Sequence, residues 1–341
     1  MGFAKETKKQ ILKNILTNDC CGLAFLSGLI NASGKFKFQN QKILKITITT
    51  EIPNVFEFCK GISIQLYGIA PTYSMLNSNN AKNAKKSKKT YHIVFPQNLA
   101  SEMLSDIGLV DETKNFTMRQ IDDHLIKDTC CKKSYIKGVF IGSATSGINF
   151  QHNEEFLDEK KLSKNKANLK KISNARNRSG YDIEFISNSH DFLLQFSNLL
   201  AEFNIFPRLI KRKNHYVLYL KESTAVSDLL ALVEAYDSVL QLQNELALRE
   251  LRNKVNRQTN CLNANISKTV DASLKQIEAL DNISNSIGID ALPPELQSIA
   301  LLRIANPEES LSELLKLSTE KITRNTLNYR LNKIIKIAKD L

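Results

Sequence analysis

An internal repeat, with its two copies separated by 110 residues, constrains the fold of this chain more than any other feature of the sequence. Two cysteines, a glycine and a serine recur in the same order and at the same spacing: Cys20, Cys21, Gly28 and Ser33 in the first copy, and Cys130, Cys131, Gly138 and Ser143 in the second. Four coincident positions at one separation indicate duplication of a structural unit. The two halves should therefore fold alike.

The segments after each copy support this interpretation. In the first half, residues 42–50 alternate apolar and polar side chains as a half-buried strand does, 52–67 has a helical pattern, and 72–76 and 91–95 are strand-like. In the second half we expect a strand at 181–187, a helix at 191–203 and a hairpin formed by 208–211 and 216–221. The sequence thus predicts a duplicated α+β unit of about 110 residues.

The net charge of the chain indicates which class of partner it binds. Its 47 Lys and Arg against 35 Asp and Glu leave a net charge of +12, which favours polyanions such as nucleic acid, although a Lys- and Asn-rich composition also arises in an AT-rich genome. Two segments are especially basic, the first at 77–90 and the second at 160–178. Such runs are usually solvated loops, which we favour, and phosphate-contacting arms are the alternative.

The location follows from what the sequence lacks. No stretch reaches the ~18 uninterrupted apolar residues of a membrane span, and the basic N-terminus is not followed by an apolar signal segment. Glu6 also breaks the myristoylation pattern that Gly2 would begin. We expect a cytoplasmic protein, associated with the nucleoid and without a membrane partner.

The cysteines do not follow a known ligand spacing. The set consists of two adjacent pairs and two single residues: Cys20, Cys21, Cys59, Cys130, Cys131 and Cys261. This pattern is neither a C-x-x-C zinc ribbon nor a secreted disulfide scaffold. Neighbouring residues on a helix point about 100° apart, so each pair can bury at most one thiol well. We favour small core residues in a reducing compartment, with no cofactor or metal, and a metal or redox role is the alternative.

The repeated helix resembles the LAGLIDADG helix of homing endonucleases. Residues 26–34 read Leu-Ser-Gly-Leu-Ile-Asn-Ala-Ser-Gly, and 136–144 form a weaker copy. In that fold the two helices pack together, and each ends in an acidic residue that holds catalytic metal. Here those positions are Ser33 and Ser143, and the preceding acidic-type positions are Asn31 and Ile141. The resemblance therefore implies the fold without a catalytic site, so we expect no nuclease activity and no enzyme.

The C-terminus has the pattern of a helix-turn-helix. Pro293 and Pro294 suit a helix start, Asn306-Pro307 ends that helix, and Ser310 to Glu313 is a capping-box sequence. Residues 318–321 provide the turn, and Thr323 can cap a last, basic helix. On this helix we expect DNA contacts from Arg324, Asn325, Asn328, Tyr329, Arg330, Lys333 and Lys336. The alternative is a three-helix bundle with a solvated basic face.

Between these parts, residues 224–280 contain no proline and favour helix. This segment carries a polar stretch rich in amides and cations. Its cations are Arg252, Lys254, Arg257 and Lys268. We favour an interdomain role for this stretch, and phosphate contact is the alternative.

The features together resemble the WhiA family of sporulation-associated regulators. The resemblance rests on the Cys-Cys pairs, the degenerate LAGLIDADG copies, the Asn-Arg-x-x-Asn-Cys stretch at 256–261 and the terminal helix-turn-helix. It implies a transcription regulator that binds double-stranded DNA mainly through the helix-turn-helix, with the transcription machinery or another regulator as further partners. A non-catalytic scaffold linked to cell division or chromosome segregation is the alternative.

The expected fold class is α+β, with a duplicated LAGLIDADG-like domain joined by helices to an all-α helix-turn-helix domain. We expect repeat 1 at residues 1–125 and repeat 2 at 126–223. A helical linker follows at 224–285, and the helix-turn-helix occupies 286–341.

Overall fold

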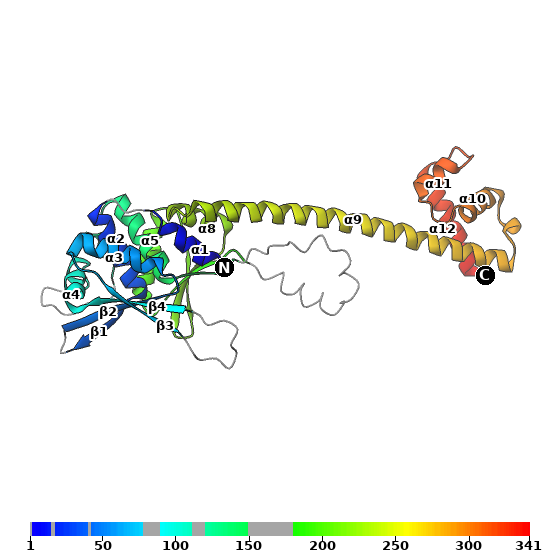
Figure 1. Ribbon diagram of the computed structural model, residues 1–341. Helices are drawn as coiled ribbons and strands as arrows, with labels where there is room; N and C mark the ends of the chain where they lie inside the picture. Colours follow the sequence, from blue (N-terminus) through cyan, green and yellow to red (C-terminus); the bar gives the residue numbers. More distant parts are fainter. Residues whose placement is uncertain (1, 15–17, 40–41, 78–88, 111–119, 149–179) are drawn as a thin grey trace. The chain divides into compact units, whose positions relative to one another are not determined.

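Two helices of 15 residues each, α2 (Asp19–Ser33) and α5 (Thr129–Ser143), pack side by side in the N-terminal half of the computed structural model (Figure 1). Each helix starts and ends at positions that the repeat aligns. Both are buried along most of their length, because their apolar and small side chains leave little polar surface to face water. The predicted pairing of the two motif helices is confirmed.

A four-stranded antiparallel sheet follows the first of these helices. Its strands are β1 (Lys35–Gln39), β2 (Lys42–Thr50), β3 (Thr72–Asn77) and β4 (Lys89–Pro96), in the order β1-β2-β4-β3. One face is apolar and buried, as Ile46, Ile48 and Ile93 show. Successive side chains on a strand point to opposite faces, so the alternation read in 42–50 gives this buried face directly. Strands β3 and β4 extend to Asn77 and Lys89, so the strands include the ends of the segment predicted as a loop at 77–90.

The second half repeats this topology. Its strands are β5 (Ala144–Ser146), β6 (Ile183–Ser187), β7 (Arg208–Arg212) and β8 (His215–Leu220), in the order β5-β6-β8-β7. The predicted hairpin is β7–β8. The same strand order after the same helix confirms the duplication that the sequence predicts.

Among the described residues, the other helices around these sheets are α1 (Phe3–Ile11), α3 (Asn54–Tyr67), α4 (Gln97–Asp106), α7 (His190–Ala201) and α8 (Ser223–Leu232). Their apolar faces join those of the sheets in one hydrophobic core, with α2 and α5 at its centre. Charged and polar side chains remain on the outer surfaces of these helices.

A second core lies near the C-terminus. It is formed by the end of α9 (Tyr236–Ser286), a 3₁₀ turn at Ile289–Ala291, and the helices α10 (Pro294–Ala305), α11 (Leu311–Leu317) and α12 (Arg324–Asp340). Leu280, Leu296 and Leu331 are among its fully buried residues. The predicted helix starts at Pro294 and after Ser310 and Thr323 are confirmed.

The structure describes residues 2–14, 18–39, 42–77, 89–110, 120–148 and 180–341, and it divides into two compact units, Met1–Leu246 and Ala247–Leu341. The basic segment 160–178 and most of the one at 77–90 lie outside the described residues. The predicted central helices are α8 and the 51-residue α9. Within the described residues, none of the helices is both long and apolar enough to span a membrane. The four-part domain division stays a prediction.

Candidate nucleic-acid interface

The last helix, α12, is held on the core of the C-terminal unit by one face. Thr323 caps its start, because the Thr323 hydroxyl accepts the backbone N–H of Thr326 at 3.2 Å. Leu327, Leu331 and Ile334 recur at helical spacing and are buried. The opposite face of the helix is therefore presented to solvent in a fixed orientation.

Four of the predicted DNA-contacting residues lie on that exposed face. Arg324 and Asn328 are one turn apart, as are Asn325 and Tyr329, so the four side chains form two adjacent rows over the first two turns. All four are exposed, and Tyr329 retains 67% of its accessible surface. Arginine and asparagine can each pair with base edges, so this surface offers donors and acceptors at the N-terminal end of a helix.

Arg330 has a different environment from these four residues. Its side chain is only 16% exposed, and its Nη1 donates to Glu320 Oε2 at 2.5 Å. Hydrogen bonds from the Ser298 hydroxyl and from Arg330 hold the pKa of the Glu320 carboxyl below its usual value. Arg330 thereby ties α12 to the turn before it. Its contact with DNA stays a prediction, and the ion pair supports a role in positioning the helix.

The two lysines further along α12 lie at the surface. Lys333 Nζ is 3.7 Å from Glu295 Oε1, with both side chains about half exposed, and such pairs contribute little to stability. Lys336 is exposed as well. Both ammonium groups can therefore reach an anion in solution at little cost.

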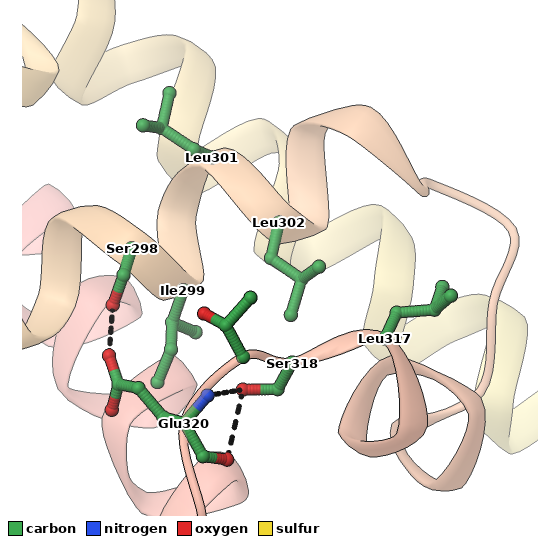
Figure 2. A pocket seen from close by; sticks show the side chains of 8 residues that line it. Ser298, Ile299, Leu301, Leu302, Leu317, Ser318 and Glu320 are labelled. Atoms are coloured by element: carbon green, nitrogen blue, oxygen red, sulfur yellow. Dashed lines mark hydrogen bonds between the residues drawn. The ribbon is translucent and has the colours of Figure 1, made fainter.

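A small open pocket of about 240 Å³ lies between α10 and the turn from α11 to α12 (Figure 2). On its polar side, the Ser298 hydroxyl donates to Glu320 Oε1 at 2.6 Å, and the Glu320 backbone N–H donates to the Ser318 hydroxyl at 3.2 Å. Leu301, Leu302 and other apolar side chains form the rest of its wall. These bonds hold the turn that orients α12.

Arg303 is a structural residue that the sequence analysis did not identify. It is 1% exposed on α10, and its guanidinium donates to Gln276 Oε1 of α9 at 2.8 Å and to the carbonyl oxygens of Asn306 and Glu309. Burial lowers its pKa, and the three neutral oxygen acceptors take the place of water around the guanidinium. It joins α9, α10 and the loop before α11. In the sequence, a single arginine among apolar residues carries no signal that separates this role from an exposed one.

The four cations proposed as phosphate or interdomain contacts lie on α9. Arg252, Lys254, Arg257 and Lys268 are all on exposed positions of the helix. Arg257 Nε donates to the Asn253 carbonyl of its own helix at 3.2 Å. Apolar residues on this part of α9 are exposed too, with Leu251 at 58% and Val255 at 50%. The roles of these cations stay predictions.

The serines at the ends of the motif helices bond within their own helices. The Ser33 hydroxyl donates to the Leu29 carbonyl at 2.9 Å, and the Ser143 hydroxyl donates to the Val139 carbonyl at 3.1 Å. Each hydroxyl proton is thus committed to the last turn of its helix. Neither position supplies the carboxylate that a hard divalent cation requires.

Comparison with known proteins shows which family has this architecture. Models of the WhiA N-terminal LAGLIDADG-like domain, the WhiA LAGLIDADG-like domain and the WhiA C-terminal HTH domain match residues 19–110, 172–252 and 255–338. The chain is 32% identical over 343 residues to the probable cell division protein WhiA of Clostridium botulinum strain Hall, covering 100% of this chain and 99% of that protein. The chain belongs to the WhiA family. The resemblance read from the sequence is confirmed.

Other WhiA proteins also match this chain over nearly its full length. The probable cell division protein WhiA of Bacillus pumilus is 31% identical, covering 100% of this chain and 97% of that protein. The crystal structure of full-length WhiA from Thermatoga maritima matches with a TM-score of 0.54 and 19% identity, covering 100% of this chain and 99% of that one. The LAGLIDADG-like repeats followed by a helix-turn-helix are therefore the fold of the family.

Proposed function

We propose that this WhiA-family protein is a DNA-binding transcription regulator without nuclease activity, which reads double-stranded DNA mainly through α12. The exposed pairs Arg324/Asn328 and Asn325/Tyr329 carry the proposal. They occupy the N-terminal turns of a helix whose opposite face is packed on a hydrophobic core. A recognition helix contacts base edges in the major groove with residues at this position. The match to the WhiA C-terminal HTH domain supports this reading.

The proposed absence of nuclease activity rests on Ser33 and Ser143. A neutral hydroxyl that already donates to its own helix is a poor substitute for a metal-binding carboxylate. The LAGLIDADG-like unit then acts as a scaffold, and the protein works in the cytoplasm on nucleoid DNA. The transcription machinery or another regulator is a further candidate partner.

The test measures binding of the full chain to genomic DNA fragments in the presence of competitor DNA. The double variant Arg324→Ala with Asn328→Ala should lose specific binding, each lost base contact costing about 1–3 kcal/mol. The matched control is Lys275→Ala with Asn282→Ala, which removes a cation and an amide from exposed positions of α9 in the same unit. Equal specific affinity in both double variants would remove the recognition role of α12.

Nuclease activity is tested separately with supercoiled plasmid and Mg²⁺ or Mn²⁺. We expect no nicking by the purified chain. Nicking that requires the metal and persists through purification to homogeneity would contradict the proposal.

A scaffold function in cell division is the second candidate. The observation that favours it is that the WhiA relatives carry the name of probable cell division proteins. Recovery of a stoichiometric protein partner that is retained after nuclease treatment, together with DNA binding that is unaltered by the α12 variant, would support it over transcription regulation.

A further inference from the structure

Two pairs of cysteines lie where α2 and α5 begin, and three of their four thiols meet. Cys20 and Cys21 lie in the first turn of α2, and Cys130 and Cys131 lie in the first turn of α5. As the helical geometry predicts, each pair buries one member: Cys21 and Cys131 are buried, whereas Cys20 and Cys130 are exposed. The motif helices thus start side by side with their cysteines facing one another.

The sulfur atoms are close enough to act together. The Sγ atoms of Cys20, Cys21 and Cys131 all lie within 4.8 Å of one another. Cys130 neighbours this cluster, since it directly precedes Cys131 in the first turn of α5. A tetrahedral zinc site with Zn–S bonds of about 2.3 Å separates its sulfurs by about 3.8 Å. The sulfur–sulfur distances in this cluster therefore exceed that spacing by at most about 1 Å.

The surroundings suit a thiolate-bound cation. Burial raises the pKa of the Cys21 and Cys131 thiols, so without a cation they stay protonated. Two helix N-termini converge on the cluster, and their partial positive charge favours the net negative charge of a zinc–thiolate centre. One sulfur lies on the exposed side, so a cation can enter from solvent. We propose that Cys20, Cys21 and Cys131 bind one thiophilic divalent cation, with Zn²⁺ as the reference ion and Cys130 or water as the fourth ligand.

Such a site would clamp the two halves of the duplicated unit at the ends of their central helices. It escapes recognition in the sequence because its ligands come from two helices, one from each repeat, and no C-x-x-C spacing is needed. The site is separate from α12 and from the serine positions at the other ends of α2 and α5.

The test uses the full-length chain, reduced and freed of metal by a chelator that is then removed. The probes are Zn²⁺ alone, followed by competition with a chromophoric chelator, and Co²⁺ alone, followed by its thiolate-to-metal absorption. We expect one cation per chain and a tetrahedral cobalt spectrum with sulfur charge-transfer bands. Cys20→Ser, at an exposed position that tolerates the change, should weaken Zn²⁺ binding at least about tenfold, because loss of a ligand costs no less than loss of an outer-shell partner.

Control variants separate this site from other thiols. Cys261→Ser changes an exposed thiol on α9 and should leave binding unchanged. Cys130→Ser should weaken Zn²⁺ binding if the fourth ligand is sulfur, and it should leave binding unchanged if that ligand is water. Either result supports the site, provided that Cys20→Ser weakens Zn²⁺ binding. Absence of stoichiometric Zn²⁺ uptake, or equal affinity in Cys20→Ser and Cys261→Ser, would overturn the proposal. A disulfide between Cys20 and Cys131 in the air-exposed chain, with no metal uptake after reduction, would overturn it in favour of a redox role.

Discussion

Gly28 of α2 and Gly138 of α5 each face the backbone of the other helix at van der Waals distance. A Cβ on Gly28 would lie 2.2 Å from the Tyr135 carbonyl oxygen, and a Cβ on Gly138 would lie 2.1 Å from the Phe25 carbonyl oxygen. The two approaches are equivalent contacts in the two copies of the repeat. Glycine is required at both positions because the obstacle is backbone, which cannot rotate away as a side chain can.

Gly28→Ala and Gly138→Ala should therefore force α2 and α5 apart. We expect each variant to lower the free energy of unfolding by at least about 3 kcal/mol, at the upper end of overpacking effects. Gly61→Ala is the matched control, since a Cβ at this exposed position of α3 meets nothing within 4 Å and should stabilise by about 0.5–1 kcal/mol. Urea denaturation of the three variants compares them. Similar stabilities for Gly28→Ala and Gly61→Ala would contradict the close packing of the helices.

Removing Glu234 from its ion pair with Lys137 should lower the free energy of unfolding more than removing Lys137. The Lys137 side chain is 7% exposed and its Nζ lies 2.7 Å from Glu234 Oε2, whereas Glu234 is 35% exposed and also accepts from Asn14. Glu234→Gln strands a buried ammonium and should cost about 2 kcal/mol, less than a fully buried pair because water reaches one partner. Lys137→Met leaves a carboxylate that water can solvate, so it should cost less. The order of the two denaturation midpoints checks this, and a reversed order would be the contrary result.

Glu320 should make the C-terminal unit sensitive to acid. Its folded pKa is lowered by the Ser298 and Arg330 hydrogen bonds, so its stabilising contribution is complete above the unfolded glutamate pKa of about 4.3. That contribution is lost as the pH falls through this value towards the lower folded pKa. The difference in unfolding free energy between the native chain and Glu320→Gln, measured across this range, should shrink as the pH falls. A difference that is constant with pH would exclude a role for this carboxylate.

Arg303 should be needed for the fold of the C-terminal unit. Arg303→Met leaves Gln276 Oε1 and the carbonyl oxygens of Asn306 and Glu309 without the donor that they share. Because buried acceptors without a partner are unfavourable, the variant should lower the free energy of unfolding by about 3 kcal/mol. Arg324→Met, the same change at an exposed site, should alter stability by less than about 0.5 kcal/mol. Denaturation midpoints and amide exchange in the 306–310 loop measure the effect. Unchanged exchange in Arg303→Met would argue against the link.

Lys336 should contribute through phosphate contact. If its ammonium neutralises one phosphate, Lys336→Ala should flatten the plot of log affinity against log salt by about 0.9 and leave sequence preference unchanged. Lys127→Ala removes one exposed charge outside the C-terminal unit and is the control. Titrations of one DNA fragment over a salt series give both slopes. An identical slope in the two variants would place Lys336 away from the DNA.

The sequence by itself determined the duplication, three strands of each sheet and the three terminal helices, and the LAGLIDADG resemblance added the pairing of the motif helices. These features follow from periodicity, spacing and capping residues, which are local properties of the chain, and the repeat adds their arrangement. Ser310 and Thr323, for example, predict the starts of α11 and α12, because their hydroxyls cap these helices. The short edge strands β1 and β5, which directly follow the motif helices, were not predicted.

Only the tertiary structure decided which polar side chains meet. Arg303 and Arg324 are both arginines on C-terminal helices, yet one is buried among three acceptors and the other faces solvent. Glu320 engages Arg330, and Lys137 engages Glu234, because helix packing brings their atoms together from separate elements. The thiols of Cys20, Cys21 and Cys131 likewise converge from two repeats. A side chain's neighbours across a core depend on how whole elements pack, whereas its place on a helix or strand depends on the few residues around it.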